Sequence, residues 1–336
     1  MRSTGNFVET NTTPKICLTV RDLETRTLRR VKQLGVDTVL MSATGIEWSE
    51  ESITSRQATL AETGLTLGNM MISGFPNTIY GRDGRDEEIE KIQETIRAAG
   101  RAGLPVIEYN FYAHRITEGY RKQEGRGGAK LESFDYERVK DLPPLPEEGA
   151  HTLDEMWDNV TYFLEAVIPV AVESGVRMAL HPNDPPPPIS RGSGQIMGSL
   201  EGWKKLVDIV DSPANGMTFD CGVTRELGEN PIEVARYLGG KDRINHVHFR
   251  NVITHTPREK YTEVFLDQGE VDLLGVMEEL VRQKYPRTLY PEHPPQMDVD
   301  LERPDKSISS GMFTGFAYTV GYARATMQAA LANQSA

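Results

Sequence analysis

The chain is poor in cysteine, in positive charge and in long apolar runs, and each shortage excludes a class of protein. Two cysteines, Cys17 and Cys221, in 336 residues give neither a disulfide framework nor a zinc-finger spacing. With 49 acidic against 37 basic residues, the net charge of −12 argues against nucleic acid or an anionic membrane as a partner. No apolar run reaches the roughly 20 residues of a membrane span. The N-terminus lacks the apolar stretch of a secretory signal, so we expect a cytoplasmic protein.

Short apolar runs alternate with charged segments of helical spacing along the whole chain. The predicted strands are 16–20, 36–41, 65–73, 105–110, 176–181, 216–220, 243–251 and 287–292. The predicted helices are 21–34, 49–63, 86–102, 153–174, 200–210, 231–238, 271–284 and 311–331. This alternation favours an α/β protein, a single (β/α)8 TIM barrel over residues 1–336. A doubly wound open sheet is the alternative, but it needs a glycine-rich phosphate turn after the first strand, where Val20-Arg21-Asp22-Leu23 has no glycine.

Residues 111–150 interrupt the alternation. The segment contains Gly125, Gly127, Gly128 and a Pro-Pro-Leu-Pro run at 143–146, mixed with aromatic and charged residues. It is too long for an ordinary connection between a strand and a helix, and loops of this length are often lids or binding loops. We expect an inserted loop or lid after the fourth strand, with a disordered insertion as the alternative.

Each of the last four predicted strands ends on or near a side chain that can bind a metal. These side chains are His181, Asp220, His248 and Glu292. The active site of such a barrel lies at the C-terminal ends of its strands, and the alternation of side chains directs all four inward if their apolar neighbours face the helices. A lone strand-end histidine is more often structural, but the coincidence across four strands favours a ligand set. Two imidazoles and two carboxylates suit Mn²⁺, with Mg²⁺, Co²⁺ or Zn²⁺ as alternatives; a contribution from Cys221 would favour Zn²⁺.

Two further histidines lie beside this set. His246 has the parity of His248 but lies two residues deeper, so we expect it to support the site from behind. His293 follows Glu292 directly, just past the strand end. It is a candidate general acid or base because an imidazole titrates near neutral pH, and a solvated loop histidine is the alternative.

Polar residues near the same strand ends are candidates for substrate binding. Arg250 is predicted to point inward above His248, where its guanidinium forms a fork for a substrate carboxylate. An ion pair with Glu292 or Asp220 is the alternative for Arg250. The other candidates are Asn110, Arg115, Asn183 and Asp184.

A series of short segments between about residues 105 and 325 carries a family resemblance. The segments are Tyr109-Asn110-Phe111, His181-Pro182-Asn183-Asp184-Pro185-Pro186, Gly216-Met217-Thr218-Phe219, His248-Phe249-Arg250-Asn251-Val252, Gly269-Glu270-Val271-Asp272, Pro291-Glu292-His293 and Gly315-Phe316-Ala317-Tyr318. In this order they resemble the D-mannonate dehydratase family of the xylose-isomerase-like barrels. Each segment alone is weak, and together they are specific. The first hundred residues match poorly.

The resemblance implies Mn²⁺ at the two strand-end histidines and at the acid of Pro-Glu-His. That acid is Glu292 here, where the family usually has Asp. The fourth family ligand is a Cys two residues after the position of Thr218, where this chain has Asp220 and places Cys221 one residue later. The family's aromatic-glycine segment after the first strand is absent, and a family Tyr aligns near Ser307.

The resemblance further implies a hydro-lyase, a mannonate dehydratase-like enzyme that converts an aldonate such as D-mannonate to a 2-keto-3-deoxy acid and water. His293 would then transfer protons, and Arg250 would hold the carboxylate. Two alternatives stay open. A sugar isomerase or epimerase on the same metal frame is favoured by the missing Tyr and by the Asp and Glu replacements, and a barrel without metal could be a non-enzymatic sugar-binding protein. We expect a small sugar acid as the partner and a homo-oligomer.

Overall fold

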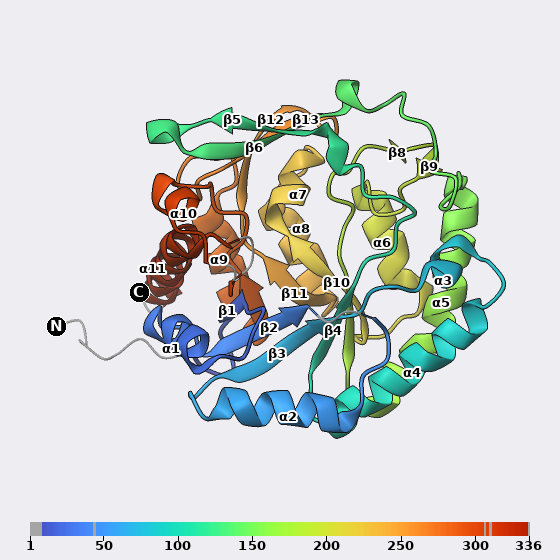
Figure 1. The fold of residues 1–336 in the computed structure, drawn as a ribbon, viewed down its shortest axis with the longest axis horizontal. Coiled ribbons are helices and arrows are strands. Elements are labelled where there is room, and N and C mark those ends of the chain that lie inside the picture. Colours follow the sequence, from blue (N-terminus) through green and yellow to red (C-terminus); the bar gives the residue numbers. More distant parts are fainter. Residues whose placement is uncertain (1–8, 43–44, 306, 309–310, 335–336) are drawn as a thin grey trace.

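Eight parallel strands close into a barrel at the centre of the molecule (Figure 1). The computed structural model describes residues 9–42, 45–305, 307–308 and 311–334. The barrel strands are β1 (Lys15–Thr19), β2 (Thr38–Ser42), β3 (Thr66–Met71), β4 (Val106–Tyr109), β7 (Arg177–Leu180), β10 (Asn215–Asp220), β11 (Ile244–His248) and β14 (Thr288–Tyr290). Their order around the barrel is β1-β14-β11-β10-β7-β4-β3-β2, which confirms the predicted architecture. The predicted extent of the domain, 1–336, includes residues outside the described ranges and stays a prediction.

The predicted helices surround the barrel. They are α1 (Thr25–Gln33), α2 (Glu50–Ala61), α4 (Arg85–Arg101), α5 (Leu153–Ser174), α6 (Leu200–Ile209), α8 (Pro231–Gly240), α9 (Leu273–Arg282) and α11 (Phe313–Gln334). Local signals set their ends, as in α5, where Thr152 and Glu155 form a reciprocal capping box and Gly175, at φ 68°, ends the helix. The sequence did not predict the short helices α3 (Pro76–Tyr80), α7 (Cys221–Glu226) and α10 (Asp298–Glu302). They are too short to show a helical repeat of apolar residues.

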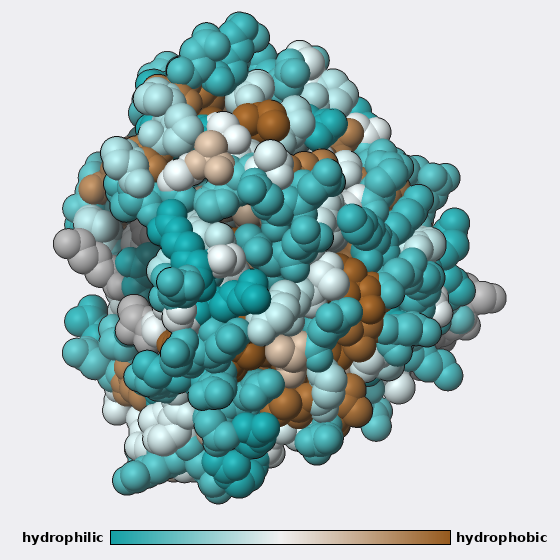
Figure 2. All heavy atoms as spheres, turned by 90° about the vertical axis from the view of Figure 1, so that its right-hand side faces the viewer, coloured by the Kyte–Doolittle hydropathy of each residue, from teal (hydrophilic) through white to brown (hydrophobic). Residues whose placement is uncertain are grey.

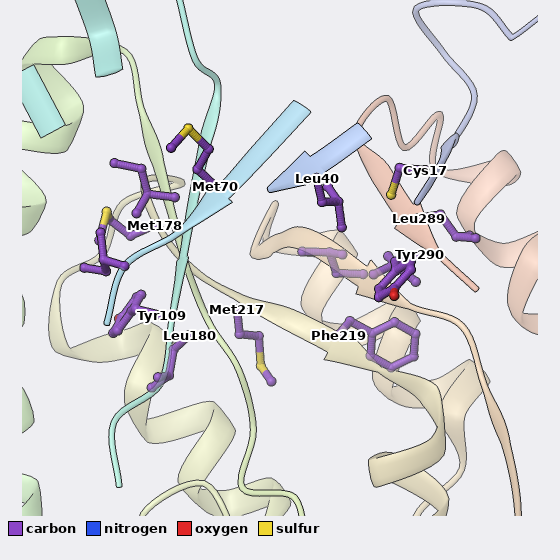
Figure 3. Packing of buried hydrophobic residues seen from close by; sticks show 14 of the residues in the cluster. Cys17, Leu40, Met70, Tyr109, Met178, Leu180, Met217, Phe219, Leu289 and Tyr290 are labelled. Atoms are coloured by element: carbon purple, nitrogen blue, oxygen red, sulfur yellow. The ribbon is translucent and has the colours of Figure 1, made fainter. Parts of the chain in front are cut away.

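Buried apolar side chains from most of the barrel strands form one continuous core. Figure 3 shows Leu40 of β2, Met70 of β3, Tyr109 of β4, Met217 of β10 and Leu289 of β14, each at most 5 % exposed. Full burial of one such side chain contributes about 1.5–3 kcal/mol. Because this core holds neighbouring strands in a fixed register, their C-terminal ends present side chains at fixed separations. The functional site depends on that register.

An aromatic cluster fastens the long helix α5 to the barrel. The Phe163 ring lies 5.5 Å from the ring of Tyr109 in β4 and 5.8 Å from the rings of Phe75 and Phe111, measured between centroids. Phe163 is fully buried. Tilted and stacked ring pairs at these separations add about 0.5–1.5 kcal/mol each beyond their buried area.

A second, antiparallel sheet is assembled from two segments far apart in the sequence, and it lies across the top of the view in Figure 1. Its strands are β5 (Tyr120–Glu124), β6 (Lys130–Asp135), β12 (Asn251–Thr256) and β13 (Lys260–Val264), in the order β12-β13-β6-β5. We call it the roof sheet. The first two strands belong to the 111–150 insertion, together with the turns η1 (Thr117–Gly119), η2 (Arg126–Gly128) and η3 (Tyr136–Arg138). That this insertion acts as a lid stays a prediction.

Between the seventh predicted strand and the helix at 271–284 we predicted no further strand, which is wrong, because β12 and β13 form a hairpin there. The two hairpins of the roof sheet share one apolar core, where Phe134 of β6 pairs with Tyr261 of β13 and their rings stack 5.4 Å apart. Ile116 and Val139 complete this core. Each hairpin supplies only part of it, so neither segment shows the apolar pattern of an independent sheet. A further small hairpin joins β8 (Ile189–Ser190) to β9 (Ser193–Gly194).

The face shown in Figure 2, which is the side of the molecule where α3, α4 and α5 lie in Figure 1, is mainly hydrophilic, and its hydrophobic residues form separate groups. The exposed apolar residues of α5 are Leu153, Tyr162 and Val172. Scattered exposure of this kind is ordinary for a folded domain. None of the helices in the described part of the chain has the length and apolar character needed to cross a membrane.

The substitution Phe163→Ala is expected to lower the free energy of unfolding by about 3–5 kcal/mol, because it leaves a cavity inside the aromatic cluster. Urea denaturation followed by circular dichroism measures the effect. The matched control is Val172→Ala on the same helix, where the side chain is 55 % exposed and the expected change is at most about 0.5 kcal/mol. Equal effects of the two substitutions would contradict the assigned role of the cluster.

Candidate active site

Four side chains from neighbouring barrel strands meet at the C-terminal end of the barrel. They are His181 after β7, Asp220 at the end of β10, His248 at the end of β11 and Glu292 after β14. One nitrogen or oxygen of each lies within 4.8 Å of the corresponding atoms of the other three. His248 is central, because its Nδ1 lies 3.0 Å from Nε2 of His181, 2.8 Å from Oε1 of Glu292 and 3.8 Å from Oδ2 of Asp220. The structure thus brings the four predicted residues together.

Polar contacts on their far sides orient the two imidazoles. Nδ1 of His181 donates to the carbonyl oxygen of Pro182 at 2.7 Å, which leaves the Nε2 lone pair directed at the cluster. Nε2 of His248 lies 3.5 Å from Oε1 of Glu108, which leaves Nδ1 toward the cluster. A carbonyl or carboxylate behind a histidine is the usual way in which a protein fixes the tautomer of a metal ligand.

The donor set fits a divalent cation. Two nitrogen lone pairs and two carboxylates point at one another at close range, and without a cation or a proton between them these atoms repel. Oε1 of Glu292 is buried and finds no donor in good hydrogen-bond geometry, although Nδ1 of His248 is close. Burial lowers the pKa of His248, but the Glu292 carboxylate and the contact with Asp220 outweigh it and raise that pKa well above its usual value. The field that attracts this proton would also attract a metal ion, which displaces protons from its ligands when it binds.

Glu108 of β4 is a functional candidate that we did not predict. Its carboxylate is buried on the cavity floor, where Oε1 accepts from Oγ1 of Thr218 at 2.9 Å and Oε2 accepts from Nδ2 of Asn69 at 3.1 Å. Oε1 also faces His248, as described above. The sequence did contain a signal, because an acid inside the buried strand Val106–Tyr109 needs a reason to be there.

The four-residue cluster borders a cavity of about 470 Å³. Of the cluster, His181, His248 and Glu292 line its wall, as do Glu108 and Tyr290. The roof sheet supplies the opposite wall through Tyr120, Lys122, Lys130, Glu132 and Glu263. A cavity of this size with a few convergent polar groups is the usual form of a small-molecule site.

The other predicted residues divide between this cavity and its surroundings. Asn110, Arg115, Asp184 and His293 line the cavity. Asn183 is 1 % exposed and lies behind it, where Oδ1 accepts from the backbone N–H of Met197 at 2.8 Å. His246 lies deeper in β11, as expected, and its Nδ1 contacts Oγ1 of Thr288 at 2.7 Å.

Arg250 lies outside the cavity lining and is 1 % exposed. Its Nε lies 2.9 Å from Oδ2 of Asp220, its Nη1 lies 2.7 Å from Oε1 of Glu226, and its Nη2 lies 3.3 Å from Oδ2 of Asp184. The alternative prediction for Arg250 was an ion pair with one of two carboxylates, and Asp220 is one of them. Glu292 was the other, and it lies farther away, at 3.7 Å from Nε. The guanidinium therefore binds buried carboxylates of the protein itself.

His293 combines an unusual backbone with a specific partner. Its φ is +49°, in the left-handed region that costs free energy for residues other than glycine. Nδ1 lies 2.7 Å from Oε2 of Glu263 in β13, and Nε2 lies 3.5 Å from Oε2 of Glu292. Burial lowers the pKa of His293, but the Glu263 carboxylate outweighs it and raises that pKa to about 9. The ring thus borders both the cavity and the four-residue cluster.

The chain matches a known protein family over nearly its whole length. The family model described as D-mannonate dehydratase (UxuA) matches residues 19–146 and 149–333. The chain belongs to the D-mannonate dehydratase family. The resemblance inferred from the sequence is thereby confirmed, and so is the hydro-lyase class at the level of the family.

Individual relatives agree with this membership. The mannonate dehydratase of Thermotoga petrophila is 31 % identical over 310 residues, with coverage of 80 % of this chain and 86 % of that protein. The crystal structure of mannonate dehydratase from Streptococcus suis serotype 2 has a TM-score of 0.82 at 26 % identity and covers 94 % of this chain and 96 % of that one. A xylose isomerase domain protein from Planctomyces limnophilus, at 14 % identity and a TM-score of 0.59, covers 95 % of this chain and 99 % of its own and shares the fold alone.

Cys221 does not replace Asp220 in the cluster of this family member. Its Sγ donates to the carbonyl oxygens of His248 and Arg250, at 3.3 Å each, from the first turn of α7. Burial raises the pKa of the Cys221 thiol. Ser307, near the family's Tyr position, hydrogen-bonds through its hydroxyl to Asp305.

His181→Ala is expected to abolish the binding of one equivalent of divalent metal, because it removes one of two nitrogen donors from a four-residue set. Metal analysis after reconstitution with Mn²⁺ and gel filtration measures the stoichiometry. The control is His255→Ala, at an exposed position on β12, which should retain the full equivalent. Metal retained by His181→Ala would contradict the assignment.

Proposed function

We propose that this chain is a metal-dependent sugar-acid dehydratase that converts an aldonate of the D-mannonate type to a 2-keto-3-deoxy acid and water. The supporting observation is the convergence of His181, Asp220, His248 and Glu292 on one point in the cavity wall of a D-mannonate dehydratase family member. These four residues would hold the cation. The donor set of two imidazoles and two carboxylates favours Mn²⁺, with Mg²⁺, Co²⁺ or Zn²⁺ as alternatives. The Sγ of Cys221, which would favour Zn²⁺, bonds to backbone carbonyls and lies outside this set.

When bound, a divalent cation polarises substrate oxygens as a Lewis acid. In the proposed reaction a base takes the C2 proton, and the C3–O bond breaks as the departing hydroxyl accepts a proton from an acid, so the net loss is one water. The resulting enol rearranges to the 2-keto acid. His293 is our candidate for proton transfer, because its imidazole borders the cavity next to Glu292. As an imidazolium it would donate to the departing C3 hydroxyl.

The substrate carboxylate needs a cation that the cavity exposes. We propose Arg115 for this role, because it lines the cavity and its side chain is 42 % exposed. Asn110 and Asp184, which also line the cavity, would bind hydroxyl groups. For Arg250, whose guanidinium faces buried carboxylates, we now propose a positioning role through Asp220. Asn183 would act in the same indirect way, by holding the backbone at Met197.

The alternative reading is a metal-dependent sugar isomerase or epimerase on the same barrel frame. Family membership supports it less well than it supports dehydration. The two reactions differ in mass, because dehydration removes one water and isomerisation changes nothing.

With added Mn²⁺, purified protein is expected to convert D-mannonate, or another member of an aldonate panel, to a product lighter by one water. Mass spectrometry detects that product, and His181→Ala serves as the inactive control. An isomeric product of unchanged mass would establish the alternative. A metal-loaded protein that alters no aldonate of the panel would refute the dehydratase proposal for that panel.

Arg115→Ala is expected to raise KM for the aldonate at least tenfold, because a charge-assisted contact with a carboxylate contributes about 1.5–3 kcal/mol. Steady-state kinetics on the metal-loaded enzyme measures the effect. The control is Arg121→Ala on β5, where the exposed side chain bonds to backbone carbonyls of Glu118 and Tyr120. An unchanged KM in Arg115→Ala would show that another group holds the carboxylate.

A cytoplasmic location fits a metabolic role of this kind and remains part of the proposal. The homo-oligomer stays a prediction, and gel filtration with light scattering tests it.

A further inference from the structure

Glu263 belongs to the roof sheet but reaches into the cavity. It lies on β13, in a segment for which no strand was predicted, and its side chain is 4 % exposed. Oε2 lies 2.7 Å from Nδ1 of His293, which belongs to the barrel end after β14. Both residues line the cavity. This contact joins the segment after β14, at the C-terminal end of the barrel, to the roof sheet.

The imidazole of His293 needs such a partner. The residue follows the last barrel strand in irregular backbone with a φ of +49°, and apart from Glu263 the short-range polar neighbour of its ring is Glu292, at 3.5 Å. When Nδ1–H donates to Glu263, the ring plane is fixed, and Nε2 is the nitrogen directed toward the metal-ligand side of the cavity. This arrangement follows the general rule that a third group orients an acid–base histidine.

Glu263 is itself held in place. Its Oε1 lies 3.4 Å from the hydroxyl of Tyr120 and 3.7 Å from Nη1 of Arg250. The Tyr120 hydroxyl lies 2.6 Å from that of Tyr261, and both tyrosines donate to Oδ1 of Asp184. A hydrogen-bonded frame therefore links three roof-sheet residues to the loop after β7. The carboxylate is presented to His293 at a fixed position.

We propose that Glu263 is a positioning residue that orients His293 for proton transfer, so that the roof sheet is part of the reacting apparatus as well as a cover for the cavity. This inference rests on the proposed dehydratase function. It adds that proton transfer by His293 depends on β13. This strand lies more than a hundred residues after β5 and β6, the first two strands of the same sheet, in the sequence. Glu263 does not contact the four-residue cluster through any hydrogen bond in the described structure.

Glu263→Ala is expected to lower kcat on the order of 100-fold, because misplacing a reacting group by about an ångström has an effect of that size. KM for the aldonate and the Mn²⁺ stoichiometry should stay close to wild type, since neither the cluster nor Arg115 loses a contact. Glu263→Gln keeps an oxygen that can accept from Nδ1–H, so it should recover most of the lost kcat. The matched control is Thr262→Val, one residue away on the opposite face of β13, where the hydroxyl bonds only within the roof sheet.

A second readout does not depend on turnover. Histidine ¹⁵N NMR of the full chain loaded with a diamagnetic divalent ion should show Nδ1 of His293 protonated in wild type and in Thr262→Val. Glu263→Ala should lose that hydrogen-bonded proton signal while circular dichroism and thermal unfolding report a folded protein.

Several outcomes would overturn the inference. They are a kcat of Glu263→Ala near that of wild type, a Glu263→Gln variant as impaired as Glu263→Ala, a loss that follows Mn²⁺ affinity rather than kcat, and an unchanged Nδ1 signal. A wild-type protein that dehydrates no aldonate refutes the proposed function instead. The NMR comparison then still decides whether Glu263 orients His293.

Discussion

The site depends on one buried cation of the protein itself, the guanidinium of Arg250. It contacts Asp220 at the end of β10, Glu226 in α7 and Asp184 in the loop after β7. A buried ion pair is a poor source of net stability, but removal of one partner costs about 3–5 kcal/mol because the other charge is left uncompensated. Arg250 therefore fixes the geometry of carboxylates that would otherwise repel one another. It holds Asp220 in the orientation from which its carboxylate faces His248.

Arg250 does not balance all of the negative charge near the cavity. Glu108, Glu263 and Glu292 are also buried carboxylates, and His248 and His293 both have raised pKa values beside them. A pocket with this excess of acid attracts protons or metal cations from solution. The net charge of −12 gives the whole molecule no general attraction for an anionic substrate, so a sugar acid would depend on local cations such as the bound metal and Arg115.

Much of the barrel end was predictable from the sequence. In a parallel barrel the strand ends lie together and alternate side chains share a face, so the position and parity of His181, Asp220, His248 and Glu292 sufficed to place them side by side. Parity alone could not show that Arg250 and Asn183 bond to other parts of the protein and do not line the cavity. A side chain that points inward can reach the cavity or meet a protein partner first.

Other parts of the site were not predicted. Glu108 is an acid inside a buried strand of four residues, and this signal was passed over. Glu263 lies in a segment for which no strand was predicted. The two hairpins of the roof sheet are joined by the pairing of β6 with β13 and by the packing of Tyr261 on Phe134. A pairing across that sequence distance cannot be seen from periodicity in either segment. The departures from the family pattern at Asp220 and Glu292, in contrast, were visible from the residues themselves.

The pairing of β6 with β13 also bears on how the chain reaches its native state. Each hairpin of the roof sheet is local and can form quickly, but Ser133 and Thr262, which pair in the sheet, are brought together only when much of the barrel between them has folded. Closure of such a long loop makes this pairing a late event in folding. A newly made chain would then assemble the four-residue cluster on the barrel before the cavity has a roof, and Glu263 would reach His293 last.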